Sequence, residues 1–436
     1  MYPSYHSPDS AARITAALDS FAFAGLAAFV FAIAAGLDSR TAGSLVLANW
    51  IILVPLAFFG LRFLAARRLR RLRAIHSWLL AFVAWAAASF LWSVAPDRTA
   101  TRIGTYAGLV LFVLLIWELA TNADRVRGLI VAYVSGAGAA SLDTVYNYLT
   151  GVSTSAQGGH QWDTSRFSVY GVNADELGLI LALSIPMALY LVITSRSRLV
   201  RAGAWLQVFV GFIAIFLSGT RGAIIALAVG LIAMIPATVS RMSRAQRGAA
   251  LLACVVILCS MRFWVPRSSI DRFLSIDAEL TQGTLTHRTV LWSAGLQVFR
   301  DHPFLGVGSG AYGPAIEEIV DLDIIGHNTF ISVLVELGVI GALLLTALLA
   351  SLVYGAFHLP YLEKCAWLAV LATWAIGVCS VTWENRKTTW FLFGLLVAQL
   401  YARRRAVLSI ADLPPETGLP AEPALVLPGS GSSYGR

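Results

Sequence analysis

Apolar blocks of about twenty residues recur along almost the whole length of this chain, each the length that an α-helix needs to cross a bilayer core of about 30 Å. Hydrophobic residues make up 58% of the sequence and charged residues only 13%, and the mean hydropathy is +0.73. A soluble domain of this length would need far more charge to cover its surface. The chain is therefore predicted to be an all-α, polytopic membrane protein.

The blocks predict about twelve transmembrane helices. Their expected bounds are 14–36, 44–64, 76–95, 103–120, 128–148, 177–195, 202–218, 222–239, 248–265, 328–356, 365–383 and 388–402. Two long loops interrupt them, at 149–176 and 266–327. The second loop contains an amphipathic stretch from Thr286 to Phe299, which is expected to form a helix that ends before Pro303.

Arginines cluster in alternate loops, so the positive-inside rule assigns those loops to the cytoplasm. They are Arg67, Arg68, Arg70, Arg71, Arg73, Arg125, Arg127, Arg196, Arg198, Arg201, Arg241, Arg244, Arg247, Arg403, Arg404 and Arg405. The predicted organisation is a cytoplasmic segment 1–13, helices one to nine in 14–265, a large outer loop 266–327, helices ten to twelve in 328–402, and a disordered cytoplasmic tail 403–436. Both long loops then face the opposite side of the membrane.

The net charge is 32 − 24 = +8. Because the basic residues lie in short loops, we assign them to membrane topology and membrane lipids, and expect no nucleic-acid partner. The outer face nevertheless carries cations that the rule should deplete there. These are Arg98, Arg102, Arg166, Arg221, Arg262, Arg267, Arg272, Arg288, Arg300, Arg386 and Lys387.

Arg221 lies in a tight turn between two predicted helices, Ser218 to Gly222. A hydroxyl of Ser218 or Thr220 is expected to cap the second helix. The backbone N–H groups of that helix start and the guanidinium together favour an anion. The alternative is an arginine that extends to the membrane interface.

Arg288 opens the predicted loop helix, with Trp292 four residues later on the same face. It is a candidate second phosphate ligand, and the alternative is a cation–π pair between the two side chains.

His327 begins the tenth predicted helix, where the helix dipole disfavours a charged imidazole and leaves it able to accept a proton. The alternative is a histidine that caps the helix. Glu336 lies on the opposite face of that helix, so a structural or pathway role is expected for it rather than a dyad with His327. The glycines from Gly306 to Gly310 are expected to form a turn that lends backbone N–H groups.

Taken in order, these segments resemble the shared core of the O-antigen ligase and polymerase family. The resemblance rests on Arg288 to Trp292, Asp301 to Gly308 and His327 to Gly341, with Ser218 to Gly222 and Arg166 to Asn173 as weaker motifs. It implies a GT-C-like membrane glycosyltransferase in the bacterial inner membrane, active at the periplasmic face. It also implies a glycan donor on undecaprenyl pyrophosphate and no metal or other cofactor.

On this hypothesis Arg221 and Arg288, with Arg166, bind the pyrophosphate, and His327 is the base or orients the acceptor. Trp292, Glu336 and Asn328 support them. Displacement at the anomeric carbon would invert its configuration. The first expectation is an O-antigen ligase acting on lipid A–core. The alternatives are a polymerase that extends a growing glycan, and a flippase or transporter of lipid-linked glycans, which would place paired charges near the membrane midplane.

Overall fold

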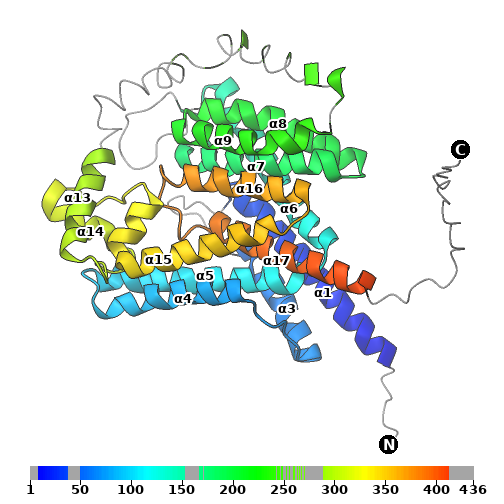
Figure 1. Ribbon diagram of the computed structural model, residues 1–436, viewed down its shortest axis with the longest axis horizontal. Helices are drawn as coiled ribbons and strands as arrows, with labels where there is room; N and C mark the ends of the chain where they lie inside the picture. Colours follow the sequence, from blue (N-terminus) through cyan, green and yellow to red (C-terminus); the bar gives the residue numbers. More distant parts are fainter. Residues whose placement is uncertain are drawn as a thin grey trace, which may run out of the picture.

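The computed structural model is all-α (Figure 1) and describes residues 8–37, 50–152, 166–169, 171–241 and 288–411, with isolated positions between 243 and 270. Its helices are α1 (Pro8–Ala34), α3 (Leu53–Ala66), α4 (Ala74–Ala88), η1 (Ser89–Leu91), α5 (Pro96–Leu119), α6 (Ala123–Thr150), α7 (Ala174–Thr194), α8 (Arg198–Ser218), α9 (Arg221–Val239), α13 (Arg288–Asp301), α14 (Tyr312–Val320), α15 (Thr329–Phe357), α16 (Tyr361–Gly377) and α17 (Lys387–Ala411).

Within the described residues, eight helices are long and apolar enough to cross a membrane: α1, α4 with the turn after it, α5, α6, α7, α8, α9 and α15. The all-α, polytopic prediction is confirmed, and the count of about twelve spans stays a prediction. Helices α3, α16 and α17 coincide with three further expected spans, although α17 continues to Ala411 instead of ending at residue 402. The expected span 248–265 lies mostly outside the described residues, as does the expected tail from residue 412 on.

Helix α7 lies at the centre of one half of the bundle, with 78% of its apolar window buried. It packs against α6, α8, α9 and α16. Helices α9 and α16 approach each other closely, because a Cβ on Gly230 would collide with the hydroxyl of Thr373. Small residues at such crossings are what allows helices to associate in lipid.

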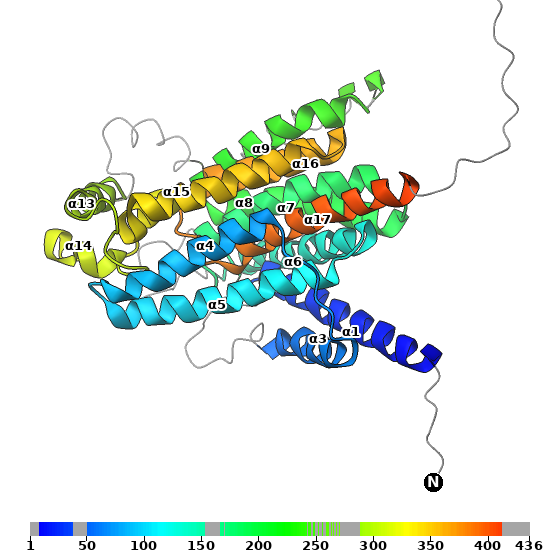
Figure 2. The same ribbon diagram turned by 60° about the horizontal axis from the view of Figure 1, so that its bottom comes forward.

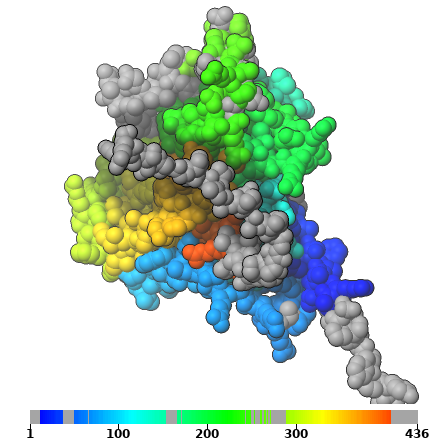
Figure 3. Space-filling view, turned by 45° about the vertical axis from the view of Figure 1, so that its right-hand side comes forward, coloured from blue at the N-terminus to red at the C-terminus, as the bar shows by residue number. Residues whose placement is uncertain are grey.

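Helices α13 and α14 lie together at one end of the bundle, beside the start of α15 (Figures 1 and 2). The start of α1 and the end of α17 lie at the opposite end, and α1 projects beyond the rest of the bundle (Figure 3). The loop helices and the two chain ends were expected on opposite sides of the membrane, and this arrangement is compatible with that prediction. The expected loop helix is confirmed as α13.

Helix α15 is interrupted at Gly338, whose backbone angles (φ 65°, ψ −169°) are not helical. The turn after α13 fits into this break, where the Val339 N–H donates to the Pro303 carbonyl at 2.9 Å. A Cβ on Gly338 would collide with the carbonyl of Phe304. The break therefore fixes the position of α13 relative to the start of α15.

Candidate active site

The start of α7 brings together two arginines from distant parts of the chain. Asn173 is its N-cap residue, and Oδ1 of Asn173 accepts a hydrogen bond from the Asp175 backbone N–H at 2.8 Å. Asp175 and Glu176 occupy the first turn, where the helix dipole favours carboxylates. One carboxylate oxygen of Asp175 binds Nη2 of Arg166, and the other binds Nη2 of Arg288 at 3.0 Å. Asp175 thus links the segment that contains Arg166, which precedes α7, to helix α13.

The turn between α8 and α9 lies against the same helix start. Arg166 donates from Nε to the Ser218 carbonyl at 2.8 Å and from Nη2 to Oγ1 of Thr220 at 2.9 Å. The Thr220 hydroxyl donates in turn to the Ala174 carbonyl at 2.9 Å. Arg221 is the next residue and the first of α9. Arg166 and Arg288 are therefore anchored at one corner of the bundle, and the backbone of Arg221 lies at the same corner.

The hydroxyl groups of this turn do not cap α9, and that prediction is wrong. Thr220 occupies the N-cap position but makes no side-chain capping bond. Ser218 Oγ is hydrogen-bonded to the Ile215 carbonyl at 2.7 Å and to Oγ1 of Thr220 at 3.0 Å. Both hydroxyls are used instead to fix the turn against α7 and to orient Arg166. Gly219 permits the turn, since its φ of +63° is one that other residues rarely adopt.

His327 lies immediately before α15 in a left-handed conformation, with φ +47°. It is not the N-cap residue, so the alternative of a capping histidine is wrong. Asn328 supplies the cap, because its Oδ1 accepts hydrogen bonds from the Phe330 and Ile331 N–H groups at 3.0 and 3.1 Å. The helix start therefore does not need the imidazole.

Trp292 fixes the backbone of Gly326, the residue before His327. Its Nε1–H donates to the Gly326 carbonyl at 2.8 Å, while Arg288, one helical turn earlier, pairs with Asp175. The two side chains have different partners, and the alternative of a cation–π clamp between them is not what the structure forms. Helix α13 thus positions Arg288 and the backbone next to His327 at once.

The charge state of His327 follows from its surroundings. Burial lowers the pKa of the imidazole, the positive charge of Arg288 lowers this pKa further, and the Asp175 carboxylate raises it in opposition. The net direction is downward, so the imidazole is neutral at pH 7 and can accept a proton. The sequence attributed a neutral imidazole to the helix dipole, whereas burial is the largest cause.

Glu336 has partners other than His327. Its Oε2 accepts a hydrogen bond from the Gly310 N–H at 2.6 Å. Nearby, Arg102 pairs with Glu384 at 2.6 Å and its charge also acts on Glu336. Both carboxylates are buried. These contacts tie Glu336 to the turn after α13, and its structural or pathway role stays a prediction.

The glycine-rich turn after α13 does not lend backbone N–H groups to a ligand, and that prediction is wrong. Four successive N–H groups donate within the protein: Val307 to the Val335 carbonyl, Gly308 to the Glu336 carbonyl, Ser309 to Oγ of Ser89 and Gly310 to Oε2 of Glu336. The glycines are needed for close packing instead, since a Cβ on Gly306 would collide with the Glu336 backbone.

Asp175 is the residue of this corner that the sequence did not reveal. Asn173, Ala174, Asp175 and Glu176 have the pattern of an ordinary capped helix start. The available signal was the excess of arginines on the predicted outer face, since partly buried arginines require acidic partners. Glu176 has such a partner too, Arg386 from the segment before α17.

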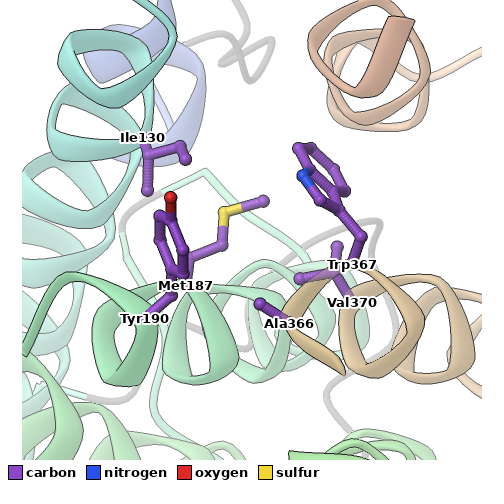
Figure 4. A pocket seen from close by; sticks show the side chains of 6 residues that line it. All are labelled: Ile130, Met187, Tyr190, Ala366, Trp367 and Val370. Atoms are coloured by element: carbon purple, nitrogen blue, oxygen red, sulfur yellow. The ribbon is translucent and has the colours of Figure 1, made fainter. Parts of the chain in front are cut away.

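No group of three His, Cys, Asp or Glu side chains among the described residues is placed to hold a metal ion. A cavity of about 20 Å³ between α6, α7 and α16 is lined by Ile130, Met187, Tyr190, Ala366, Trp367 and Val370 (Figure 4). It has room for about one water molecule and is lined mainly by apolar side chains, so it does not fit a glycan or a diphosphate.

Two comparisons with known proteins find similarity to this chain. Residues 206–346 match the family described as O-antigen ligase. This region includes Arg221, Arg288, His327 and Glu336, whereas Arg166 and Asp175 lie before it. The chain is also 26% identical over 304 residues to the "Exopolysaccharide production protein ExoQ" of Rhizobium meliloti (strain 1021). That match covers 65% of each chain, just under two thirds of the relative's length. Over residues 206–346 the chain is therefore similar to the O-antigen ligase family.

Proposed function

We propose that this protein is an inverting glycosyltransferase of the bacterial inner membrane. It transfers a glycan from undecaprenyl pyrophosphate to a sugar hydroxyl at the periplasmic face. The observation that supports this most strongly is the pair of arginines, Arg166 and Arg288, that Asp175 holds near His327, whose pKa is lowered by burial.

In the proposed reaction, the acceptor oxygen forms a bond to the anomeric carbon while the bond from that carbon to the phosphate oxygen breaks. The proton of the acceptor hydroxyl passes to His327, and undecaprenyl pyrophosphate leaves with the electron pair. Arginine forks suit the leaving group because they bind phosphate oxygens with two N–H groups. Donors aimed at developing charge are among the largest contributions to catalysis.

Asp175 is proposed as a positioning residue in this scheme. It holds the guanidinium groups of Arg166 and Arg288 and prevents two adjacent cations from repelling each other before the donor binds. A pyrophosphate would meet arginines whose orientation is already fixed, which reduces the entropy cost of binding.

An O-antigen ligase acting on lipid A–core is the first candidate, from the family that residues 206–346 match. A polymerase that passes the glycan to another repeat unit is the second candidate. The similarity to a protein described as an exopolysaccharide production protein favours the second. Both use the same donor and the same bond formation.

A transporter of lipid-linked glycans is a less favourable proposal. Arg288 is the first residue of α13, which lies at one end of the bundle (Figure 1), and His327 directly precedes α15, whereas a transporter site is expected near the membrane midplane.

Purified protein tests the acceptor directly. The full chain is incubated with undecaprenyl pyrophosphate-linked repeat unit, with and without lipid A–core, and the products are identified by mass spectrometry. A ligase forms product only when lipid A–core is present, and a polymerase lengthens the donor glycan in its absence. Intact donor under both conditions contradicts the proposal.

A further inference from the structure

A groove of about 840 Å³ opens between α6 and α8, and Leu191 of α7 also lines it. Small residues on both walls make it wide, among them Gly138 and Ala139 on α6 and Ala202 and Gly203 on α8. A Cβ on Gly203 would meet no atom within 4 Å, so this wall is open. The volume is in the range of sites that take a drug-sized ligand, about 300–1,000 Å³.

The interior of the groove suits an apolar chain. Its buried polar side chain, Gln207, donates to Ser184 Oγ at 2.7 Å and accepts from Ser141 Oγ at 3.2 Å. Because these hydrogen bonds satisfy the amide, a ligand does not have to supply a polar partner there. The lining is otherwise mainly aliphatic side chains, as expected where a hydrocarbon chain lies.

One end of the groove is basic. Arg127 on α6 lies one helical turn before Val131, which lines one wall, and Arg198 on α8 lies one turn before Ala202 on the other wall. Arg198 is exposed, and Nε of Arg127 has no hydrogen-bond partner among the described residues. Asp124 lies 3.5 Å from Arg127, but its side chain is 91% exposed, so this pair is weak.

We infer that this groove is a binding site for an anionic phospholipid of the leaflet at the arginine-rich end of the bundle. One acyl chain lies between α6 and α8, and the phosphate lies between Arg127 and Arg198. The groove is separate from the proposed active site, because Leu191 lies about 24 Å along α7 from Asp175. The inference does not depend on the proposed glycan transfer.

Lipid binding to the purified full chain tests the site. Native mass spectrometry measures binding of phosphatidylglycerol and of phosphatidylcholine with the same acyl chains. Wild type is expected to bind one phosphatidylglycerol more tightly than phosphatidylcholine. Arg127→Gln and Arg198→Gln should each weaken phosphatidylglycerol binding about fivefold, while Arg241→Gln, at the same end but outside the groove, should not.

A plug in the groove tests the acyl-chain part. Gly203→Leu should reduce binding of both lipids, whereas Gly108→Leu, an equally open glycine on α5, should leave it unchanged. The arginine variants test the site by themselves if Gly203→Leu fails to fold. Equal affinity of wild type for the two lipids overturns the inference, and so do arginine variants that bind like wild type. A disulfide between the thiol of Gly203→Cys and Cys254 or Cys259 also overturns it, because the groove would then hold the segment 248–265.

Discussion

At the scale of single residues, Asp175 organises the proposed site, because its carboxylate binds guanidinium groups from two sides. Arg166 lies in the stretch 149–176, which the sequence predicted to be a long loop. Its bonds to Ser218, Thr220 and Asp175 make it as firmly held as Arg288. The arginines therefore act as one unit, and their substitutions should not be additive.

Arg288→Lys keeps the charge at this position but loses the fork. We predict that glycan transfer falls by about 10²-fold, as when one charge-stabilising donor is lost. The comparison is with Arg300→Lys, an exposed position on the same helix, which should transfer like wild type. The same substitution at Arg221 should also reduce transfer. Full activity of both lysine variants would exclude bidentate binding of the pyrophosphate.

His327→Asn separates a base from a structural residue. Asparagine tolerates the left-handed backbone that His327 adopts, and Asn328 keeps the helix cap. The variant should therefore fold, with transfer reduced by about 10²–10⁴-fold. A thermal melt checks folding and a single-turnover assay measures transfer. Wild-type turnover of the asparagine variant would leave His327 without a chemical role.

The pH dependence of the transfer rate reports the protonation of the His327 imidazole. A base is lost when pH falls below its pKa, and the pKa of His327 is lowered by burial and by Arg288. The acid limb of the rate profile should therefore lie below the ordinary histidine value of about 6.5. Arg288→Gln removes the positive charge, raises this pKa and should move the limb to higher pH, whereas Asp175→Asn should move it lower. A limb that stays at one pH in all three proteins contradicts the assignment.

At the scale of elements, the break in α15 and the turn after α13 form one unit that fixes Arg288 and His327 relative to each other. Gly338 has backbone angles that only glycine adopts readily, and a side chain there would collide with Phe304. Gly338→Ala should lower stability by at least about 1–3 kcal/mol. Gly104→Ala, in an open helical position on α5, serves as the control and should not lower it. Equal melting temperatures of the two variants in detergent would show that the break is not required.

The sequence predicted these helices well because length and hydropathy determine membrane spans. Its motifs proposed Arg288 and His327 as site residues, and their roles stay a prediction. It assigned the turn glycines to ligand binding. Their N–H groups are used inside the protein, and only the packing of Gly306 against α15 reveals this. Asp175 was missed because its role depends on contacts with Arg166 and with Arg288, 113 positions away.

At the scale of the whole molecule, the proposal requires α13 and α14 to face the periplasm, where the donor glycan would be available. Reporter fusions after Arg67 and after Asp412 should report the cytoplasm, and fusions within 270–320 should report the periplasm. The reason is the distribution of arginines between alternate loops. A cytoplasmic signal from 270–320 would separate the arginine corner from its proposed donor.

The central claim is that the arginine–histidine corner makes a glycosidic bond. The direct measurement is the release of undecaprenyl pyrophosphate from a glycan-linked donor by the protein in proteoliposomes, counted against new glycosidic bonds. The account predicts one undecaprenyl pyrophosphate per bond in wild type and in Arg300→Lys, and loss of both products in His327→Asn and Arg288→Lys. Movement of intact donor across the membrane without bond formation would contradict it.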